Sequence, residues 1–452
     1  MEPKSWIISV NMGYGHQRTA YPLRNLAPEE KIINANDYEG IPAKDRAIWE
    51  GIRKFYEAIS NLYRVPLIGE TIFSVFDKFQ KILNFYPKRD LSKPNSQLKQ
   101  TFSTIKNGWG RHLILRLGAS AESFDSELRT NLLSRTSSGQ VEKPLPLITT
   151  FFTPAFMADF FNYPGEIFCI VCDADISRTW ASLDPKKSRI KYFAPTERAV
   201  ERLKLYGVKP ENIFLTGYPL PIENIGLDNS ETLKEDLRHR LLNLDPEKKY
   251  FEKYKILIEE KLGKLPDKPN HLLTIMFSVG GAGAQREIGT KIIRSLKERI
   301  KAREIKLILS VGIKEEVNNY FLKNIKDLDL NNQLDGNIEI LFAKSIEEYF
   351  KKFNQILRKT DILWTKPSEL SFYSALGLPI IIAPPIGSQE DFNMRWLLKS
   401  GFGISQENPR YTNQWLFDWL KKGYLADFAM QEFIKGEKMG TFNIKRIVQT
   451  PY

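Results

Sequence analysis

Short apolar runs alternate with longer segments of helical period at both ends of the chain. This alternation is typical of βαβ units, in which parallel strands are joined by helices. In the first half, the pattern predicts strands at 5–11, 31–37, 146–152, 167–173, 189–195 and 212–218. In the second half, it predicts strands at 271–280, 305–312, 338–343, 361–366 and 378–384. We therefore predict two α/β halves, in keeping with a length of 452 residues, which exceeds the roughly 100–200 residues of one domain.

A Lys- and Glu-rich segment at 223–268 separates the two halves and ends in a Pro-containing stretch. This composition predicts an exposed helical insertion that leads into a linker. The predicted N-terminal domain covers 1–222 and holds a helical insertion at about 40–145. The charged linker covers 223–270 and the C-terminal domain 271–404. The amphipathic, aromatic segment 405–452 is expected to form helices that pack back on the N-terminal domain.

The region 45–90 carries aromatic residues at near-helical spacing, with Arg and Lys between them. One interpretation is a membrane-surface element, whose apolar side chains enter lipid while its cations meet anionic headgroups. The other is a pair of helices that covers the core. The spacing alone leaves both open.

The composition is that of a soluble globular protein, with 42% hydrophobic and 27% charged residues. No run approaches the roughly 18 apolar residues that span a bilayer, and the first residues lack the pattern of a signal peptide, so we expect a cytoplasmic protein. Cys169 and Cys172 fall in an apolar run and are expected to be small core residues. The net charge of +12 favours anionic partners such as lipid, nucleic acid or phosphorylated small molecules, without choosing among them.

The first candidate site follows the first predicted strand, in the stretch NMGYGHQRTA. Gly13 and Gly15 permit a tight turn, and a helix is expected to begin near Gln17, with His16 at the tip of the turn. The spacing matches neither the dinucleotide fingerprint nor a P-loop. An ordinary turn with an exposed histidine is the alternative.

A second glycine turn stands at the equivalent place in the other half, where Gly280, Gly281 and Gly283 follow a strand and precede a helix. Successive backbone N–H groups in such a turn form a nest that binds anions. One turn in each half predicts two Rossmann-like domains that face each other across a cleft.

The third candidate site lies at 361–401. Lys366 follows a strand, and a helix is expected to begin near Ser368, so the two together can neutralise a diphosphate. Further polar residues that can bond to sugar or ribose hydroxyls are Glu369, Gln389, Glu390 and Asn393.

With these motifs in this order, the chain resembles glycosyltransferase family 28 and its relatives of the GT-B fold, among them the diacylglycerol glycosyltransferases and the N-acetylglucosaminyltransferase that makes lipid II. The family's G-x-G-H turn matches Gly13, Gly15 and His16. Its Asp and Trp segment matches the stretch from Asp173 to Pro219. Its T-K-P and G-x-x-E-x-x-N turns match 365–367 and 387–393. The resemblance covers most of the chain apart from 45–145, 223–268 and the tail.

The resemblance implies an inverting transfer of a sugar from a nucleotide-diphospho-sugar, with UDP as the expected nucleotide, to a lipid or lipid-linked acceptor. The donor is expected in the C-terminal half. Asp173 and Asp175 are then candidate catalytic residues on the acceptor side, together with His16. Further acceptor-side residues are Gly13, Gly15, Arg178 and Trp180. Neither a metal nor a cofactor is required, although the DAD sequence at 173–175 superficially resembles a metal motif. His16 is the candidate base, since an ordinary imidazole has a pKa near ~6.5; its rival role is to hold the donor diphosphate.

The same resemblance implies a peripheral enzyme on the inner face of an anionic membrane, a monomer or weak dimer that does not bind nucleic acid. Two departures from the family pattern stand out. The segment after Lys366 is two residues shorter, so that Phe372 occupies the position of the Glu that binds the donor ribose, and the family's His after Asp173 is absent. The alternatives are another GT-B enzyme, such as a nucleotide-sugar 2-epimerase, and a binding protein that has lost catalysis.

Overall fold

The computed structural model describes residues 4–62, 82–118, 144–227, 229–281 and 283–450. The chain divides into two compact units. Unit 1 consists of Met1–Pro219 and Met439–Tyr452, and unit 2 consists of Leu220–Lys438. Each unit is built on its own sheet, so the two are described in turn.

Unit 1 holds a parallel sheet of six strands in the order β2-β1-β3-β4-β5-β6. The strands are β1 (Trp6–Ser9), β2 (Ile33–Asn34), β3 (Leu147–Thr149), β4 (Ile167–Ile170), β5 (Lys191–Ala194) and β6 (Ile213–Leu215). Apart from β2 and β6, they are almost entirely buried, as expected for a parallel sheet covered on both faces. Because β1 pairs with both β2 and β3, the strand order reverses between β1 and β3.

Helices cover both faces of this sheet. They are α1 (Tyr14–Ala20), η1 (Tyr21–Leu26), η2 (Pro28–Glu30), α2 (Ala43–Leu62), α4 (Ser96–Lys106), α5 (Arg111–Gly118), α7 (Phe152–Phe160), η3 (Arg178–Trp180), α8 (Glu197–Leu205), η4 (Pro210–Asn212) and α18 (Gly440–Gln449). In α2, the buried Trp49 packs against Trp109 at 4.8 Å between ring centroids, so the start of the aromatic region contributes to the core. Residues 63–81 of that region lie outside the described residues.

Unit 2 repeats the architecture with a parallel sheet in the order β12-β11-β10-β7-β8-β9. Its strands are β7 (Leu273–Ser278), β8 (Ile305–Gly312), β9 (Ile338–Phe342), β10 (Ile362–Thr365), β11 (Ile380–Ile382) and β12 (Gly403–Ser405). The strand β7 pairs with β8 on one side and β10 on the other. The order therefore reverses between β7 and β10, at the place that corresponds to β1 and β3 in unit 1.

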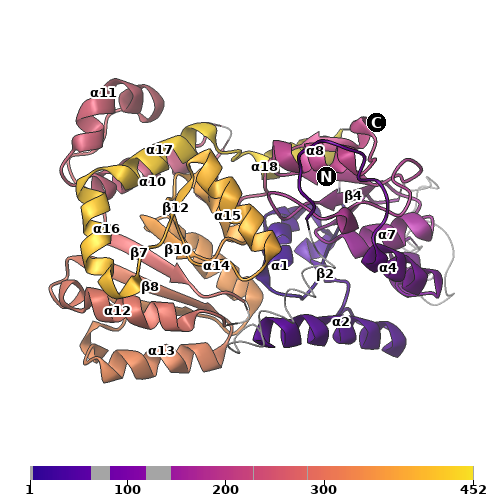
Figure 1. Cartoon of the computed structure of the whole chain (residues 1–452), viewed down its shortest axis with the longest axis horizontal. Coiled ribbons are helices and arrows are strands. Elements are labelled where there is room, and N and C mark those ends of the chain that lie inside the picture. The colour runs from indigo at the N-terminus through magenta and orange to yellow at the C-terminus, as the bar shows by residue number, and fades with distance from the viewer. Residues whose placement is uncertain (1–3, 63–81, 119–143, 228, 282, 451–452) are drawn as a thin grey trace, which may run out of the picture. The chain divides into compact units, whose positions relative to one another are not determined.

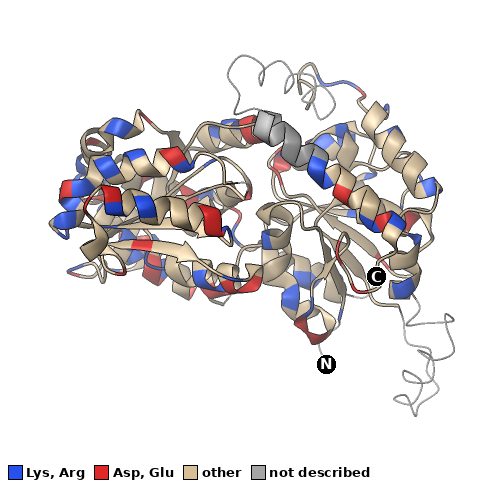
Figure 2. Ribbon diagram, turned by 90° about the horizontal axis from the view of Figure 1, so that it is seen from below, with Lys and Arg blue, Asp and Glu red and all other residues tan. Residues whose placement is uncertain are grey.

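The helices of unit 2 are α9 (Ile222–Ile225), α10 (Glu231–Leu244), α11 (Lys249–Leu262), α12 (Arg286–Lys301), α13 (Glu315–Asp327), η5 (Asn331–Gln333), α14 (Ile346–Leu357), η6 (Glu369–Leu376), α15 (Ser388–Ser400), η7 (Pro409–Tyr411), α16 (Thr412–Lys421) and α17 (Tyr424–Lys435). Their apolar stripes face the sheet; in α12, for example, Ile292, Leu296 and Ile300 are fully buried. Charged residues lie mainly on helices and loops (Figure 2).

The predicted fold class is confirmed, since each half is a parallel α/β unit of the Rossmann type. Every predicted strand overlaps an observed one, while β12 is an additional strand. The predicted exposure of 223–268 is wrong for α10, whose Leu233, Leu237 and Leu241 are buried, although α11 is largely exposed. The cleft between the halves stays a prediction.

The C-terminal tail is shared between the units. Residues 405–438, which the sequence analysis grouped with the returning tail, belong to unit 2, whereas α18 belongs to unit 1. Ile444 and Val448 of α18 join the core formed by Ile7 and Leu23. Gly440 makes this close approach possible, because a Cβ there would come within 2.1 Å of the Tyr218 carbonyl oxygen.

Candidate functional site

The strand order of both sheets places the predicted motifs at equivalent positions. In unit 1, the Gly13 turn follows β1 and Thr150 follows β3; in unit 2, the Gly280 turn follows β7 and Lys366 follows β10. These four strands are the two pairs at which the strand order reverses. Open parallel sheets bind ligands at the carboxyl ends of such strands, because the connections there leave to opposite sides and open a crevice.

The glycine turn of unit 1 is tighter than its sequence suggests. Helix α1 begins at Tyr14, three residues before the expected start at Gln17, so His16 lies in the first turn of the helix instead of at the tip of a loop. Gly13 precedes the helix with φ of 99°, a conformation that side chains rarely adopt. Gly15 is part of the helix, and its carbonyl accepts the Thr19 hydroxyl at 2.8 Å.

A hydrogen bond joins His16, in the helix after β1, to Thr150, which follows β3. Its Nδ1 lies 2.7 Å from the Thr150 carbonyl oxygen, and its ring packs edge-on against Phe151 at 4.8 Å between centroids. A carbonyl oxygen only accepts, so Nδ1 carries the proton, and the lone pair of the neutral imidazole is on Nε2. The fold thus fixes both the orientation and the tautomer of this half-buried ring.

The two aspartates differ in their surroundings. Asp173 is half-buried in the loop after β4. Asp175 is buried and accepts two bonds of 2.8 Å from Nε and Nη2 of Arg202, which is fully buried on α8. Burial lowers the pKa of Arg202, but the bonds to Asp175 outweigh it and raise that pKa above its usual value. This bidentate pair ties Asp175 to α8, and the expected part of Asp175 in catalysis stays a prediction.

Arg178 and Trp180 are also buried in the interior of unit 1. Arg178 is 5% exposed and donates to the carbonyls of Ser92, Ala181 and Ser182 at 2.7–3.0 Å. Trp180 is buried against Phe152. The Arg178 guanidinium thus joins Ser92 to the loop after β4, and the acceptor-side expectation for Arg178 and Trp180 stays a prediction.

In unit 2, the glycine turn lies directly on Lys366. A Cβ at Gly280 would come within 2.7 Å of Lys366 Cε, so the lysine side chain would have to shift if Gly280 carried a side chain. Gly283 closes the turn by donating its N–H to the Gly280 carbonyl at 2.7 Å, and its φ is 73°. Gly281 lies between them in the turn.

Lys366 and Glu390 form an ion pair at the same reversal point. The Lys366 ammonium contacts Oε1 of Glu390, and Oε2 accepts the Ile386 N–H at 2.8 Å. The side chains are only 21% and 16% exposed. The structure therefore brings together two residues, 24 positions apart, that the sequence analysis had placed in one site.

The other predicted donor residues surround this pair. The Ser368 N–H donates to the Lys366 carbonyl at 2.9 Å, and the helix that begins at Glu369 is a 3₁₀-helix. Gln389 lies in the first turn of α15. The buried Asn393 donates Nδ2 to the Pro367 carbonyl at 3.3 Å, which fixes the turn that carries Lys366.

Phe372, at the position of the family's ribose-binding Glu, is buried in the core. Its ring centroid lies 5.1 Å from that of Trp396.

Gln285, which the sequence analysis did not select, donates Nε2 to the Pro384 carbonyl at 2.7 Å and links the loops after β7 and β11. Its place within the second glycine stretch was the only signal available.

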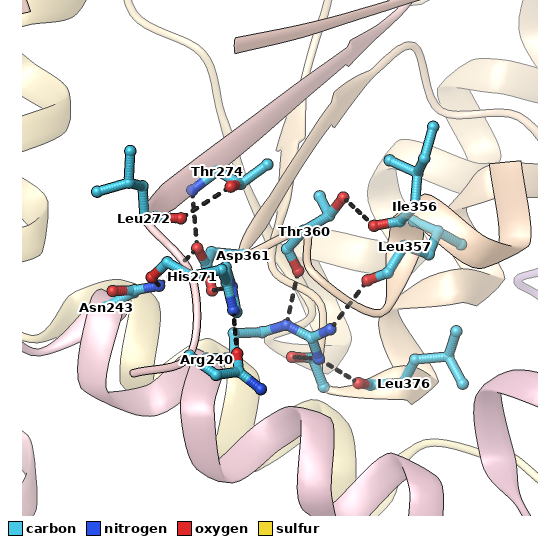
Figure 3. A network of polar contacts seen from close by, with 12 residues as sticks. Arg240, Asn243, His271, Leu272, Thr274, Ile356, Leu357, Thr360, Asp361 and Leu376 are labelled. Carbon is cyan, nitrogen blue, oxygen red and sulfur yellow. Dashed lines mark hydrogen bonds and ion pairs between the residues drawn. The ribbon is translucent and has the colours of Figure 1, made fainter. Parts of the chain in front are cut away.

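Unit 2 holds a buried polar network that joins α10 to the residues just before β10 (Figure 3). Arg240 on α10 donates to the carbonyls of Thr360, Leu376 and Gly377 at 2.7–2.9 Å. Asp361, at the start of β10, accepts the Thr274 N–H at 2.8 Å and lies 3.1 Å from His271 Nε2. Burial raises the pKa of Asp361, against these bonds. The network secures the strand that carries Lys366.

In the described part of the chain, no three His, Cys, Asp or Glu side chains converge in a way that suits a metal ion. Nor does any of its helices combine the length and apolar character that a membrane span needs.

Comparisons with known proteins give the following similarities. A family model described as a domain of unknown function, DUF6938, matches residues 267–335. The processive diacylglycerol beta-glucosyltransferase of Bacillus licheniformis is 25% identical over 219 residues, which are 47% of this chain. This match spans 45% of that protein's length. The predicted resemblance to lipid glycosyltransferases is confirmed at this level.

Similar solved structures include S. aureus MnaA with UDP, which is 11% identical with a TM-score of 0.46 and covers 99% of this chain and 95% of that one. MurG of Acinetobacter baumannii is 11% identical with a TM-score of 0.43 and covers 99% of both chains. A putative UDP-N-acetylglucosamine 2-epimerase of Listeria monocytogenes is 13% identical with a TM-score of 0.41, and covers 68% of this chain and 72% of that one.

Proposed function

We propose that the chain is a glycosyltransferase that moves a sugar from a nucleotide-diphospho-sugar to a lipid or lipid-linked acceptor at a membrane surface, with inversion. One observation carries the proposal: both sheets present reactive side chains where their strand order reverses, His16 in unit 1 and Lys366 in unit 2. The similarity to a diacylglycerol glucosyltransferase supports the reaction class and the lipid acceptor.

In this proposal, unit 2 binds the donor. The Lys366 ammonium, the N–H groups of the Gly280 turn and the start of α15 supply positive charge for a diphosphate. Gly280 leaves room for the Lys366 side chain over the turn, and Asn393 holds the lysine turn in place. Because Phe372 is buried, the ribose hydroxyls have to be bound by another residue, and Glu369 at the start of η6 is our candidate.

Unit 1 supplies the base. Since Nδ1 of His16 is protonated toward Thr150, Nε2 accepts the proton of the acceptor hydroxyl. The hydroxyl oxygen then bonds to the anomeric carbon, while the bond from that carbon to the diphosphate oxygen breaks. The leaving nucleoside diphosphate takes the electron pair, and Lys366 neutralises the charge that develops on it. Atoms and charge balance without a further reactant.

The distribution of charge supports an anionic membrane as the site of action. Lys and Arg outnumber Asp and Glu by 32 to 23 in unit 1 and by only 34 to 31 in unit 2. Within unit 1, residues 43–143 alone hold 17 basic and 10 acidic residues. Among them, Lys88 and Arg89 follow closely after an exposed aromatic side chain, Tyr86, which is 68% exposed. Basic residues with exposed aromatic ones favour binding to anionic lipid headgroups.

The test is transfer by the full chain from UDP-glucose, UDP-galactose or UDP-N-acetylglucosamine to diacylglycerol in anionic vesicles. We expect UDP release that requires the diacylglycerol. Conversion of UDP-N-acetylglucosamine to its 2-epimer without acceptor would replace the proposal by the epimerase alternative. Binding of UDP without turnover of any donor would favour a lapsed enzyme. If UDP, GDP and dTDP neither bind in calorimetry nor raise the melting temperature, both enzymatic interpretations are wrong.

A further inference from the structure

Glu390 holds two hydrogen-bond donors at once. Its Oε1 contacts the Lys366 ammonium, and its Oε2 accepts the Ile386 N–H at 2.8 Å. A carboxylate thus bridges a lysine on the loop after β10 and a backbone amide in the turn before α15. These two donors lie at the strand reversal, beside the Gly280 turn.

A phosphate group is suited to the same donors. Like a carboxylate, it presents oxygens that accept one bond from an ammonium and another from a backbone N–H. The surroundings favour an anion, since the lysine is largely screened from water and the glycine turn adds further N–H groups. A phosphate and Glu390 cannot both be fully bonded to these donors, because each carries negative charge.

We propose that Glu390 is an internal competitor for the phosphate ligand of unit 2. Its carboxylate occupies the donors that a phosphate would use, and a phosphate binds Lys366 only when Glu390 moves away from it. When the product leaves, Glu390 returns to the lysine and the amide. The inference rests on the proposed function for the identity of the ligand, a nucleoside diphosphate, but its chemistry applies to any diphosphate.

The competing explanation is that Glu390 only caps a helix. It is the third residue of α15, and a glutamate there commonly accepts a backbone N–H just before the helix. Glu348 of α14 provides an internal comparison: it accepts the Lys344 N–H at 3.0 Å and pairs with Lys352 at 2.7 Å. Its pair is well exposed and follows the edge strand β9, outside the strand reversal.

The experiment measures the affinity of the full chain for UDP and for inorganic pyrophosphate by calorimetry. The variants are Glu390→Gln, the matched control Glu348→Gln, and Lys366→Met in the Glu390→Gln background. The amide of Glu390→Gln still accepts the Ile386 N–H, and a thermal melt checks that each variant is folded. We expect Glu390→Gln to bind both ligands about 10-fold more tightly than the wild type, which corresponds to about 1.4 kcal/mol.

Glu348→Gln should stay within about twofold of the wild type, and Lys366→Met should abolish the gain. Pyrophosphate binding that is unchanged or weaker in Glu390→Gln overturns the inference, as does an equal gain in Glu348→Gln. If the wild type binds and transfers from a UDP-sugar without such a gain, the inference fails and the proposed function stands. If pyrophosphate shows the gain but no nucleotide binds, competition stands and the proposed function fails.

Discussion

The two units place different chemistry at the same point of the same topology. Unit 1 presents an imidazole whose Nδ1 is bonded to a backbone carbonyl. Unit 2 presents an ammonium bonded to a carboxylate. In the function that we propose, strand order fixes where each side chain acts, while its bonded partner fixes whether it handles protons or phosphate.

The buried acids of the two units differ in the same way. Asp175 of unit 1 is neutralised by one guanidinium, Arg202, in a closed pair. Asp361 of unit 2 is shared among Asn243, His271 and the Thr274 N–H, none of which is a permanent cation. Asp175 is therefore bonded by one cationic side chain, whereas Asp361 is bonded by several groups of unit 2.

The largest expected effect concerns the base of unit 1. His16→Ala should lower transfer by about 10²–10⁴-fold, since that is what a positioned general base contributes. UDP affinity, which we assign to unit 2, should stay within a few fold. Steady-state transfer and UDP calorimetry measure the two quantities. The control is His112→Ala, because His112 is exposed and bonds to Tyr38 in the same unit. Unchanged turnover in His16→Ala would remove the histidine from the mechanism.

The second-largest expected effect is a loss of stability when the ion pair between Asp175 and Arg202 is broken. Asp175→Asn leaves Arg202 buried without its counter-charge, which costs about 3–5 kcal/mol of unfolding free energy. Denaturant unfolding, followed by tryptophan fluorescence, gives the change. Glu201→Gln is the control: Glu201 pairs with Lys88 on the surface, where such a pair contributes about 0–1 kcal/mol. Equal destabilisation by the two variants would contradict a stabilising role of the pair between Asp175 and Arg202.

In unit 2, Lys366→Met should weaken UDP binding by about 10–100-fold, as expected for the loss of a charge-assisted bond to phosphate. Uridine, which lacks the phosphates, should bind both proteins equally. Lys352→Met removes a lysine that also pairs with a glutamate, and it should leave UDP affinity unchanged. An unaltered dissociation constant for UDP in Lys366→Met would show that the lysine does not face the phosphates.

The smallest effect is a pH dependence in unit 2. Burial raises the pKa of Glu432 on α17 well above its usual range, and neither Arg240 nor the backbone at Ile380 offsets this. The folded protein thus keeps a proton that the unfolded chain releases above pH ~4.3. The contribution of this group to stability therefore falls as pH rises beyond that value, until the folded pKa is reached.

Glu432→Gln should remove this contribution, because the amide stays neutral in both states. Denaturant unfolding of both proteins at pH 5, 6 and 7 checks it. The stability of the variant relative to the wild type is expected to increase across the series. A constant difference would mean that Glu432 ionises alike in the folded and unfolded states.

Much of the fold could be predicted from the sequence, because buried parallel strands appear as short apolar runs. The strand β12 was missed because its sequence, Gly-Ile-Ser, is not an apolar run, and Gly403 within it approaches the β11 backbone too closely for a side chain, at 2.7 Å for a Cβ. The exposure of 223–268 was misjudged because its composition is charged. Nothing local to Arg240 indicates that backbone carbonyls more than a hundred residues away accept its bonds.

The site was partly predictable for a related reason. Gly280, Lys366 and Glu390 stand beside strands in recognisable turns, so local patterns located them. The commitment of Asp175 to Arg202 depends on a tertiary contact with α8, and the tautomer of His16 depends on a carbonyl 134 residues away. Single-sequence reasoning has no access to such partners.

The return of α18 to unit 1 also sets an order of events during synthesis. Ile444 and Val448 complete the core around Ile7 and Leu23, so unit 1 stays unfinished until the ribosome has passed residue 450. Unit 2 is a continuous insert and has all of its residues earlier. The growing chain therefore contains every residue of unit 2 before it contains every residue of unit 1.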